Sequence, residues 1–161
     1  MLTRRHVRIK VIQSLYSFFI SKNNDLKKEI HFFNESISNI FELYYSLISL
    51  LITFYKYSNN QIKNLKRAKL DVTEKINNYQ KIKDNIILFL INKRCKSNKK
   101  KFKEKDKEWE LENKHVKILL DELFKSDFFK KYFLIKKPSF KQQKQIILDF
   151  FIEIIAPSNY I

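Results

Sequence analysis

The first 18 residues contain a set of side chains that suits the recognition of nucleic acid. Three arginines, Arg4, Arg5 and Arg8, precede Gln13 and Tyr16 in one short segment. A guanidinium group pairs with two phosphate oxygens, a carboxamide hydrogen-bonds a base or a sugar, and a tyrosine ring can stack on an unpaired base. These five residues therefore predict a surface for single-stranded RNA, with Lys10 as a further candidate.

The same segment is expected to be an amphipathic helix, because neither glycine nor proline interrupts it. Thr3 suits the N-cap position. Arginines at the start of a helix oppose the helix dipole, at a cost of roughly 0.3–1 kcal/mol each. This misfit favours a role in binding, and the alternative is a solvated helix start. The apolar side of the helix is formed by Val7, Val11, Ser14, Leu15 and Phe18.

The spacing of these residues resembles the amino-terminal signature of the NusB family of transcription antitermination proteins. The matching positions are Arg4, Arg5, Arg8, Gln13, Leu15 and Tyr16, and Ile9 departs from the family, in which many members have a glutamate. The resemblance implies an all-helical protein that binds the boxA element of ribosomal RNA leaders. It also implies a partner, the ribosomal protein NusE, and a role in the transcription elongation complex.

Later segments extend this resemblance to family members with a long amino-terminal half. They are Trp109 before a helix, Lys130-Lys131-Tyr132, and Ile155-Ala156-Pro157 after an apolar helix. The family continues from there into its usual carboxyl-terminal half, whereas this sequence stops at Ile161. The expectation is a shortened NusB-like domain over residues 1–161.

Composition favours a helical fold. The chain has 161 residues, 44% of them hydrophobic, with no glycine and two prolines. Sheets depend on glycine and proline in their turns, so this scarcity argues for helices. We predict a single all-α domain, a bundle of about five to six helices with a long central helix.

The central helix is predicted from an unbroken alternation of three- and four-residue steps over residues 26–54. From Phe41 onward the opposite side is apolar as well, which is typical of a helix surrounded by others. Residues 41–55 are too short for a membrane span of ~20 apolar residues, since Glu42 interrupts the stretch near its start and Lys56 ends it. We therefore expect a buried helix without membrane insertion, with an extended coiled coil as the alternative.

Positive charge is concentrated in the middle of the chain. The formal net charge is +16, and residues 56–107 contain 17 Lys or Arg against five Asp or Glu. Residues 57–78 and 95–107 are predicted to be basic loops or linkers, with a loosely packed helix as the alternative over residues 57–78. Lys99, Lys100 and Lys101 would form a mobile electrostatic arm that adds affinity for RNA but little selectivity.

Other expected features are more local. Asn24 or Asp25 should cap the central helix, Trp109 should fill a gap in the core, and Ser139 and Gln142 should form a capping box. Further helices are predicted over residues 79–94, 113–125, 127–133 and 140–156.

Nothing in the sequence indicates catalysis. His6, His31 and His115 lie on different segments, no set of side chains has metal-ligand spacing, and a glycine-rich phosphate loop is excluded. We expect no enzyme activity, no cofactor and no metal. The single Cys95 excludes an internal disulfide and fits a reducing, cytoplasmic location.

The sequence therefore predicts an RNA-binding transcription antitermination factor of NusB-like type. The alternative is a helical structural or interaction module that binds RNA or anionic lipid non-specifically through its positive charge.

Overall fold

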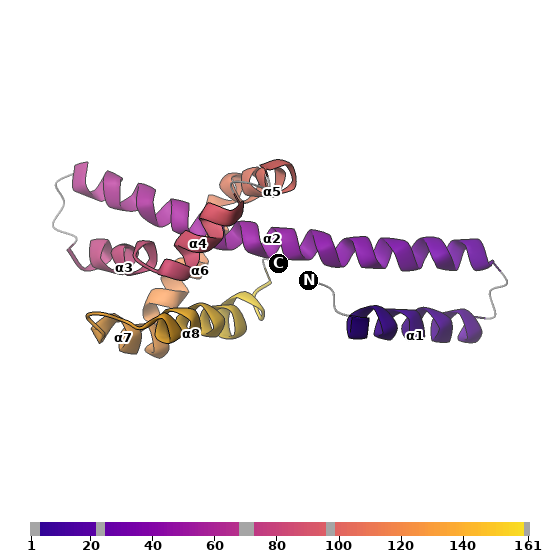
Figure 1. The fold of residues 1–161 in the computed structure, drawn as a ribbon. Helices are drawn as coiled ribbons and strands as arrows, with labels where there is room; N and C mark the ends of the chain where they lie inside the picture. Colours follow the sequence, from indigo (N-terminus) through magenta and orange to yellow (C-terminus); the bar gives the residue numbers. More distant parts are fainter. Residues whose placement is uncertain (1–3, 22–24, 68–72, 96–98, 160–161) are drawn as a thin grey trace. The chain divides into compact units, whose positions relative to one another are not determined.

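The computed structural model describes residues 4–21, 25–67, 73–95 and 99–159. In these ranges the chain contains eight α-helices and no strand, so the predicted all-α class is confirmed (Figure 1). There are more helices than the five or six expected, but the long central helix is present. The elements are α1 (Arg4–Ile20), α2 (Leu26–Arg67), α3 (Thr73–Lys83), α4 (Ile86–Cys95), α5 (Lys99–Leu111), α6 (Asn113–Lys125), α7 (Asp127–Leu134), α8 (Phe140–Phe150) and the π-helix η1 (Phe151–Ile155).

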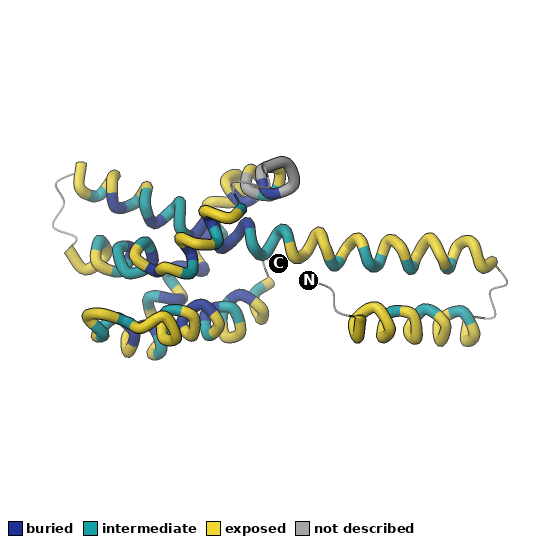
Figure 2. Tube along the Cα trace, viewed as in Figure 1, coloured by how far each residue is buried: buried dark blue, intermediate teal, exposed yellow. Residues whose placement is uncertain are grey.

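The chain is grouped by its internal contacts into two compact units, where the sequence predicts a single domain. Unit 1 comprises Met1–Tyr45 and unit 2 comprises Ser46–Ile161. Helix α2 contributes its first part to unit 1 and the remainder to unit 2. Burial distinguishes the two units, because no described residue before position 46 is buried, whereas 49–54 are all buried (Figure 2).

Unit 1 is a helical hairpin in which α1 lies beside the first part of α2 (Figure 1). The carboxylate of Asp25 starts α2, since its Oδ1 accepts hydrogen bonds from the amides of Lys27 and Lys28 at 3.1 and 3.2 Å. The predicted cap at Asp25 is confirmed, whereas Thr3 lies outside the described residues. On the expected apolar side of α1, only Ser14 and Phe18 are half-buried, and the remaining members are exposed.

Unit 2 contains the hydrophobic core, which surrounds the second part of α2 as predicted. Phe54 is 1% exposed, and its ring packs against that of Phe150 with centroids 5.0 Å apart. Trp109 is also buried, and its Nε1 donates a hydrogen bond to the carbonyl of Ser46 at 3.0 Å, so its predicted core role is confirmed. Helix α8 packs against α4 and α7, and η1 packs against α6.

The prediction of a single helix over residues 79–94 is wrong, because the helix is interrupted between α3, which ends at Lys83, and α4, which begins at Ile86. Asn85 is 1% exposed and caps α4, its Oδ1 accepting from the amides of Ile87 and Leu88 at 2.9 and 3.3 Å. Its Nδ2 donates to the carbonyl of Gln143 on α8 at 3.0 Å. Asparagine competes with the helical backbone for hydrogen bonds, and here that competition starts a new helix.

The two predicted basic segments are helical where they are described, and residues 68–72 and 96–98 lie outside the described residues. Over residues 57–78 this is the helical alternative, and over residues 95–107 it corrects the expected loop. Helix α2 continues to Arg67 and buries Ser58 and Ile62, and α3 begins at Thr73. Helix α5 begins at Lys99 and buries Phe102. Lysine and glutamate are good helix formers, so a few buried apolar side chains are enough to keep such segments helical.

The carboxyl-terminal helices agree closely with the sequence. Helix α6 has the predicted bounds, α7 matches the expected short aromatic helix, and Ser139 and Gln142 form the predicted capping box. The end of the last helix differs. Residues 151–155 widen into a π-helix, in which the amide of Ala156 donates to the carbonyl of Phe151 at 2.8 Å.

Helix α2 is the one helix among the described residues that is long and apolar enough to cross a membrane. Its most apolar 18-residue window has a mean hydropathy of 1.4 and is 33% buried. Core helices of globular proteins pass the same test, and eight α2 residues are buried in unit 2. The expectation of a buried helix is therefore confirmed for the second part of α2.

Three tyrosines make unit 2 sensitive to alkali: Tyr79 and Tyr132 are buried, and Tyr57 is half-buried. Burial, then the neighbouring Tyr57 and Asp121, raises the pKa of Tyr79 to about 12. Burial also raises the pKa of Tyr57 and of Tyr132. A pKa raised in the folded state gives stability that is complete below the unfolded value near 10 and is lost as the pH rises towards 12.

We therefore expect unit 2 to lose stability between about pH 10 and pH 12. Tyrosinate absorbance followed alongside circular dichroism measures both events. In Tyr79→Phe the loss of stability should be smaller over this range, because phenylalanine has no proton whose release is coupled to unfolding. Ionisation of all tyrosines near pH 10 without any change in structure would contradict the burial of Tyr79.

Candidate nucleic-acid interface

The side chains predicted to bind RNA are displayed on a regular helix. Arg4, Arg5, Arg8 and Gln13 are exposed on α1, and Tyr16 is 67% exposed. Lys10 is half-buried. The cations are therefore accessible to a ligand, and their exposure means that they contribute little to folding.

The structure does not bring these residues together on a single face of α1. Arg4 and Arg8 are one turn apart and share one side. His6 is two positions from Arg4, about 200° around the helix, and Lys10 and Gln13 follow His6 on that other side. Arg5 and Tyr16 lie on the outer surface between the two sides. A ligand that touches all of them has to pass around the first turns of α1.

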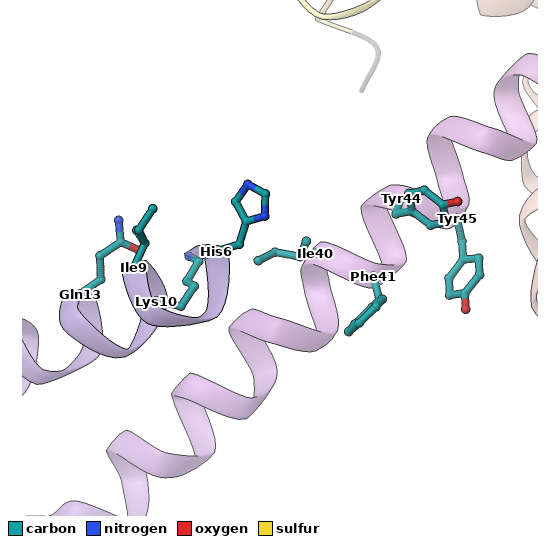
Figure 3. A pocket seen from close by; sticks show the side chains of 8 residues that line it. All are labelled: His6, Ile9, Lys10, Gln13, Ile40, Phe41, Tyr44 and Tyr45. Carbon is teal, nitrogen blue, oxygen red and sulfur yellow. The ribbon is translucent and has the colours of Figure 1, made fainter. Parts of the chain in front are cut away.

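A groove of about 640 Å³ lies in unit 1 between α1 and α2 (Figure 3). Ile40 points from α2 towards the start of α1, close to His6. Gln13 and Lys10 are the two predicted site residues that line this groove. The complete lining is His6, Ile9, Lys10 and Gln13 from α1, with Ile40, Phe41, Tyr44 and Tyr45 from α2.

The groove combines an apolar and aromatic wall with a polar one. On α2, Phe41 and Tyr44 are 40% and 47% exposed, and the rings of Tyr44 and Tyr45 meet edge to face at 5.8 Å. On α1, the imidazole of His6, the ammonium of Lys10 and the carboxamide of Gln13 supply hydrogen-bonding groups. This arrangement can hold a flat ligand that has both a π-face and a polar edge.

Sequence reasoning does not find the aromatic wall of the groove. Ile40 and Tyr44 belong to the regular seam of α2, and Phe41 and Tyr45 to its opposite side, so the pattern alone indicates packing residues at all four positions. If α1 and α2 are assumed to pair as an antiparallel hairpin, these four residues lie opposite His6 and Gln13. That assumption is the one way in which the sequence could have indicated the groove.

The lysine cluster belongs to unit 2. Lys99, Lys100 and Lys101 form the first turn of α5, where the sequence predicts a basic loop, and their role as an electrostatic arm stays a prediction. Their side chains are outside the described part of the structure. They add positive charge to a different unit from the one that contains α1.

Unit 2 also contains a polar groove of about 880 Å³ along α2. Lys56 crosses part of it to an ion pair with Glu110, at 3.5 Å between Nζ and Oε1. Such an exposed ion pair contributes little stability. Its amide-bearing lining residues are Asn59, Asn60, Gln61, Asn92 and Asn113.

Within the described ranges, no group of three or more His, Cys, Asp or Glu side chains is placed to hold a metal ion. No protein-family model matches the chain, and neither a curated protein nor a solved structure matches it. The function is therefore inferred from the exposed residues of α1, the groove beside them, and the resemblance in the first helix.

Proposed function

We propose that this chain is an RNA-binding transcription antitermination factor of NusB-like type. It binds a boxA-like single strand through α1, acts in the cytoplasm within the transcription elongation complex, and has NusE as its protein partner. The observation that supports RNA binding best is the exposure of Arg4, Arg5 and Arg8 at the start of an ordered helix. The antitermination role and the partner rest on the resemblance of the first helix to the NusB family.

Arginine at these three positions favours phosphate recognition over simple solubility. The guanidinium fork binds phosphate oxygens in pairs, whereas lysine acts as a point charge. Exposed cations at a helix start give no benefit to the helix itself. Tyr16, 67% exposed on the outer surface of α1, offers a ring for stacking next to this cationic segment.

The test is to replace Arg4, Arg5 and Arg8 together with alanine and to measure RNA binding over a salt series. We expect affinity for a boxA-like strand to fall by about tenfold or more at moderate salt. The dependence of log affinity on log salt should also become shallower, by about 0.7 for each phosphate of a single strand that is no longer neutralised. The thermal unfolding curve should stay unchanged, because the three side chains are exposed.

The control removes equal charge from unit 2. Lys136, Lys137 and Lys144 are exposed there, and their triple alanine variant loses the same three positive charges. We expect it to retain the preference of the native protein for a boxA-like strand over a scrambled one. An equal loss of affinity in both triple variants, with no preference between the strands, would reject recognition by α1.

A second candidate function is supported by the apolar surface of unit 1. Ile12, Phe19 and Ile20 are 66%, 75% and 62% exposed, which is unusual for large apolar side chains so close together. An exposed apolar surface favours a helical interaction module. In such a module the positive charge of the chain binds polyanions without selectivity. Equal binding of both RNA strands, or binding to anionic vesicles in place of RNA, would support this module.

A further inference from the structure

We propose that the groove between α1 and α2 in unit 1 receives one unpaired nucleobase of the bound RNA strand. The inference rests on the proposed function and adds a base-reading site to it. The volume, about 640 Å³, is within the range of about 300–1,000 Å³ that is usual for small-ligand sites. The occupant is a base from a strand whose phosphates are held by the arginines of α1.

The apolar wall provides the stacking surface. Phe41 and Tyr44 on α2 are 40% and 47% exposed, and Ile9 on α1 is 43% exposed, so these side chains keep a large apolar area in contact with water in the free protein. A base covers that area with its π-face, and aromatic side chains accept any of the four bases in this way. The wall therefore supplies affinity that does not depend on charge.

The polar wall provides selectivity. Gln13 offers one carbonyl acceptor and two amide donors, a combination that can pair with the edge of a base. The ammonium of Lys10 and the imidazole of His6 line the same groove. A base that leaves these groups without partners binds less well, because a polar group that loses water needs a new hydrogen bond.

The positive charge at the start of α1 favours a nucleic acid over a second copy of the chain. Arg4, Arg5 and Arg8 lie in the first turns of α1, at the same end of the helix as His6 but outside the groove lining. A second copy docked through its own groove brings the same three arginines, which repel, whereas an RNA strand brings phosphates. Glu42 is the acidic residue next to Phe41 in sequence, and it is outside the groove lining.

The experiment compares Tyr44→Ala, Phe41→Ala and Gln13→Ala with the native protein, using boxA-like RNAs in which one base at a time is replaced by an abasic residue. We expect the Tyr44→Ala variant to bind intact RNA about tenfold more weakly. Its salt dependence should remain that of the native protein, since every phosphate keeps its cationic partner. At one abasic position the native protein and the variant should bind equally, which identifies the base in the groove.

Two controls keep the result interpretable. Phe32→Ala removes an aromatic ring of unit 1 that is 59% exposed and lies outside the groove, so it should bind like the native protein. Tyr44→Phe keeps the stacking ring and should restore most of the affinity. Far-ultraviolet circular dichroism of every variant shows whether the hairpin remains helical. If unfolding caused the loss in Tyr44→Ala, this variant would bind more weakly than the native protein at every abasic position.

The outcomes separate this inference from the proposed function. If all three groove variants bind every RNA like the native protein, while the triple arginine variant loses affinity, the base site is rejected and RNA binding stands. If the groove variants alter only the oligomeric state measured by light scattering, the groove is a protein-docking surface and the inference is again overturned. If no variant of α1 affects RNA binding, both proposals fail.

Discussion

Replacing Phe54 with alanine is expected to lower the free energy of unfolding by about 3–5 kcal/mol. The side chain is 1% exposed in the centre of unit 2, and its ring packs against that of Phe150. Alanine removes the buried ring and leaves a cavity that helices on several sides cannot close. Urea unfolding followed by the fluorescence of the buried Trp109 measures the change, which is a large part of the stability of a typical domain, about 5–15 kcal/mol.

The matched control for this prediction is Phe140→Ala, in the same unit. Phe140 begins α8 and is 59% exposed, so its removal should alter the free energy of unfolding by less than about 0.5 kcal/mol. Phe54→Leu should fall between the two, because leucine refills part of the cavity. Similar midpoints for Phe54→Ala and Phe140→Ala would mean that Phe54 is not at the centre of the core.

Replacing Asn85 with alanine should cost about 2–4 kcal/mol, since two kinds of hydrogen bond are removed together. The α4 amides of Ile87 and Leu88 lose their cap, and the carbonyl of Gln143 loses its donor. A second hydrogen bond joins the same two helices, in which the Oε1 of Gln143 accepts from the amide of Ile86 at 2.7 Å. Thermal and urea unfolding of the variant measure the cost.

A double-mutant cycle with Gln143→Ala tests whether the two side chains act as one connection between α4 and α8. We expect the double variant to lose less stability than the sum of the single variants, because both side chains connect the start of α4 to α8: Asn85 Nδ2 donates to the backbone carbonyl of Gln143, and Gln143 Oε1 accepts from the amide of Ile86. Asn77→Ala is the control, since Asn77 is exposed on α3. Strict additivity, or an equally small effect of Asn85→Ala and Asn77→Ala, would show that this connection does not stabilise unit 2.

Those parts of the fold that depend on local pattern could be predicted from the sequence. The periodicity of residues 26–54 correctly indicates a long helix, and Ser139 with Gln142 correctly indicates a helix start. The break at Asn85 could not be predicted, because an asparagine within an apolar pattern can be an interior helix residue or a cap. The partner that decides between them, Gln143, is distant in sequence.

The interface was predictable only in part, for a similar reason. Arg4, Arg5 and Arg8 are exposed as expected, but the amphipathic pattern predicted for the first helix is wrong, because Val7, Val11 and Leu15 on its apolar side are exposed as well. The groove depends on which residues of α2 lie opposite His6 and Gln13, and this depends on how the hairpin closes. Periodicity gives the faces of each helix but not the register between them.

The change in burial along α2 has a consequence for how this protein can evolve. In unit 2, a substitution at a position such as Leu120 or Phe129 is constrained by folding before it can affect any function. In unit 1, where no described residue is buried, most substitutions have little effect on folding. Selection on α1 therefore acts almost entirely through what the helix binds, and that surface can drift or specialise while the core of unit 2 stays the same.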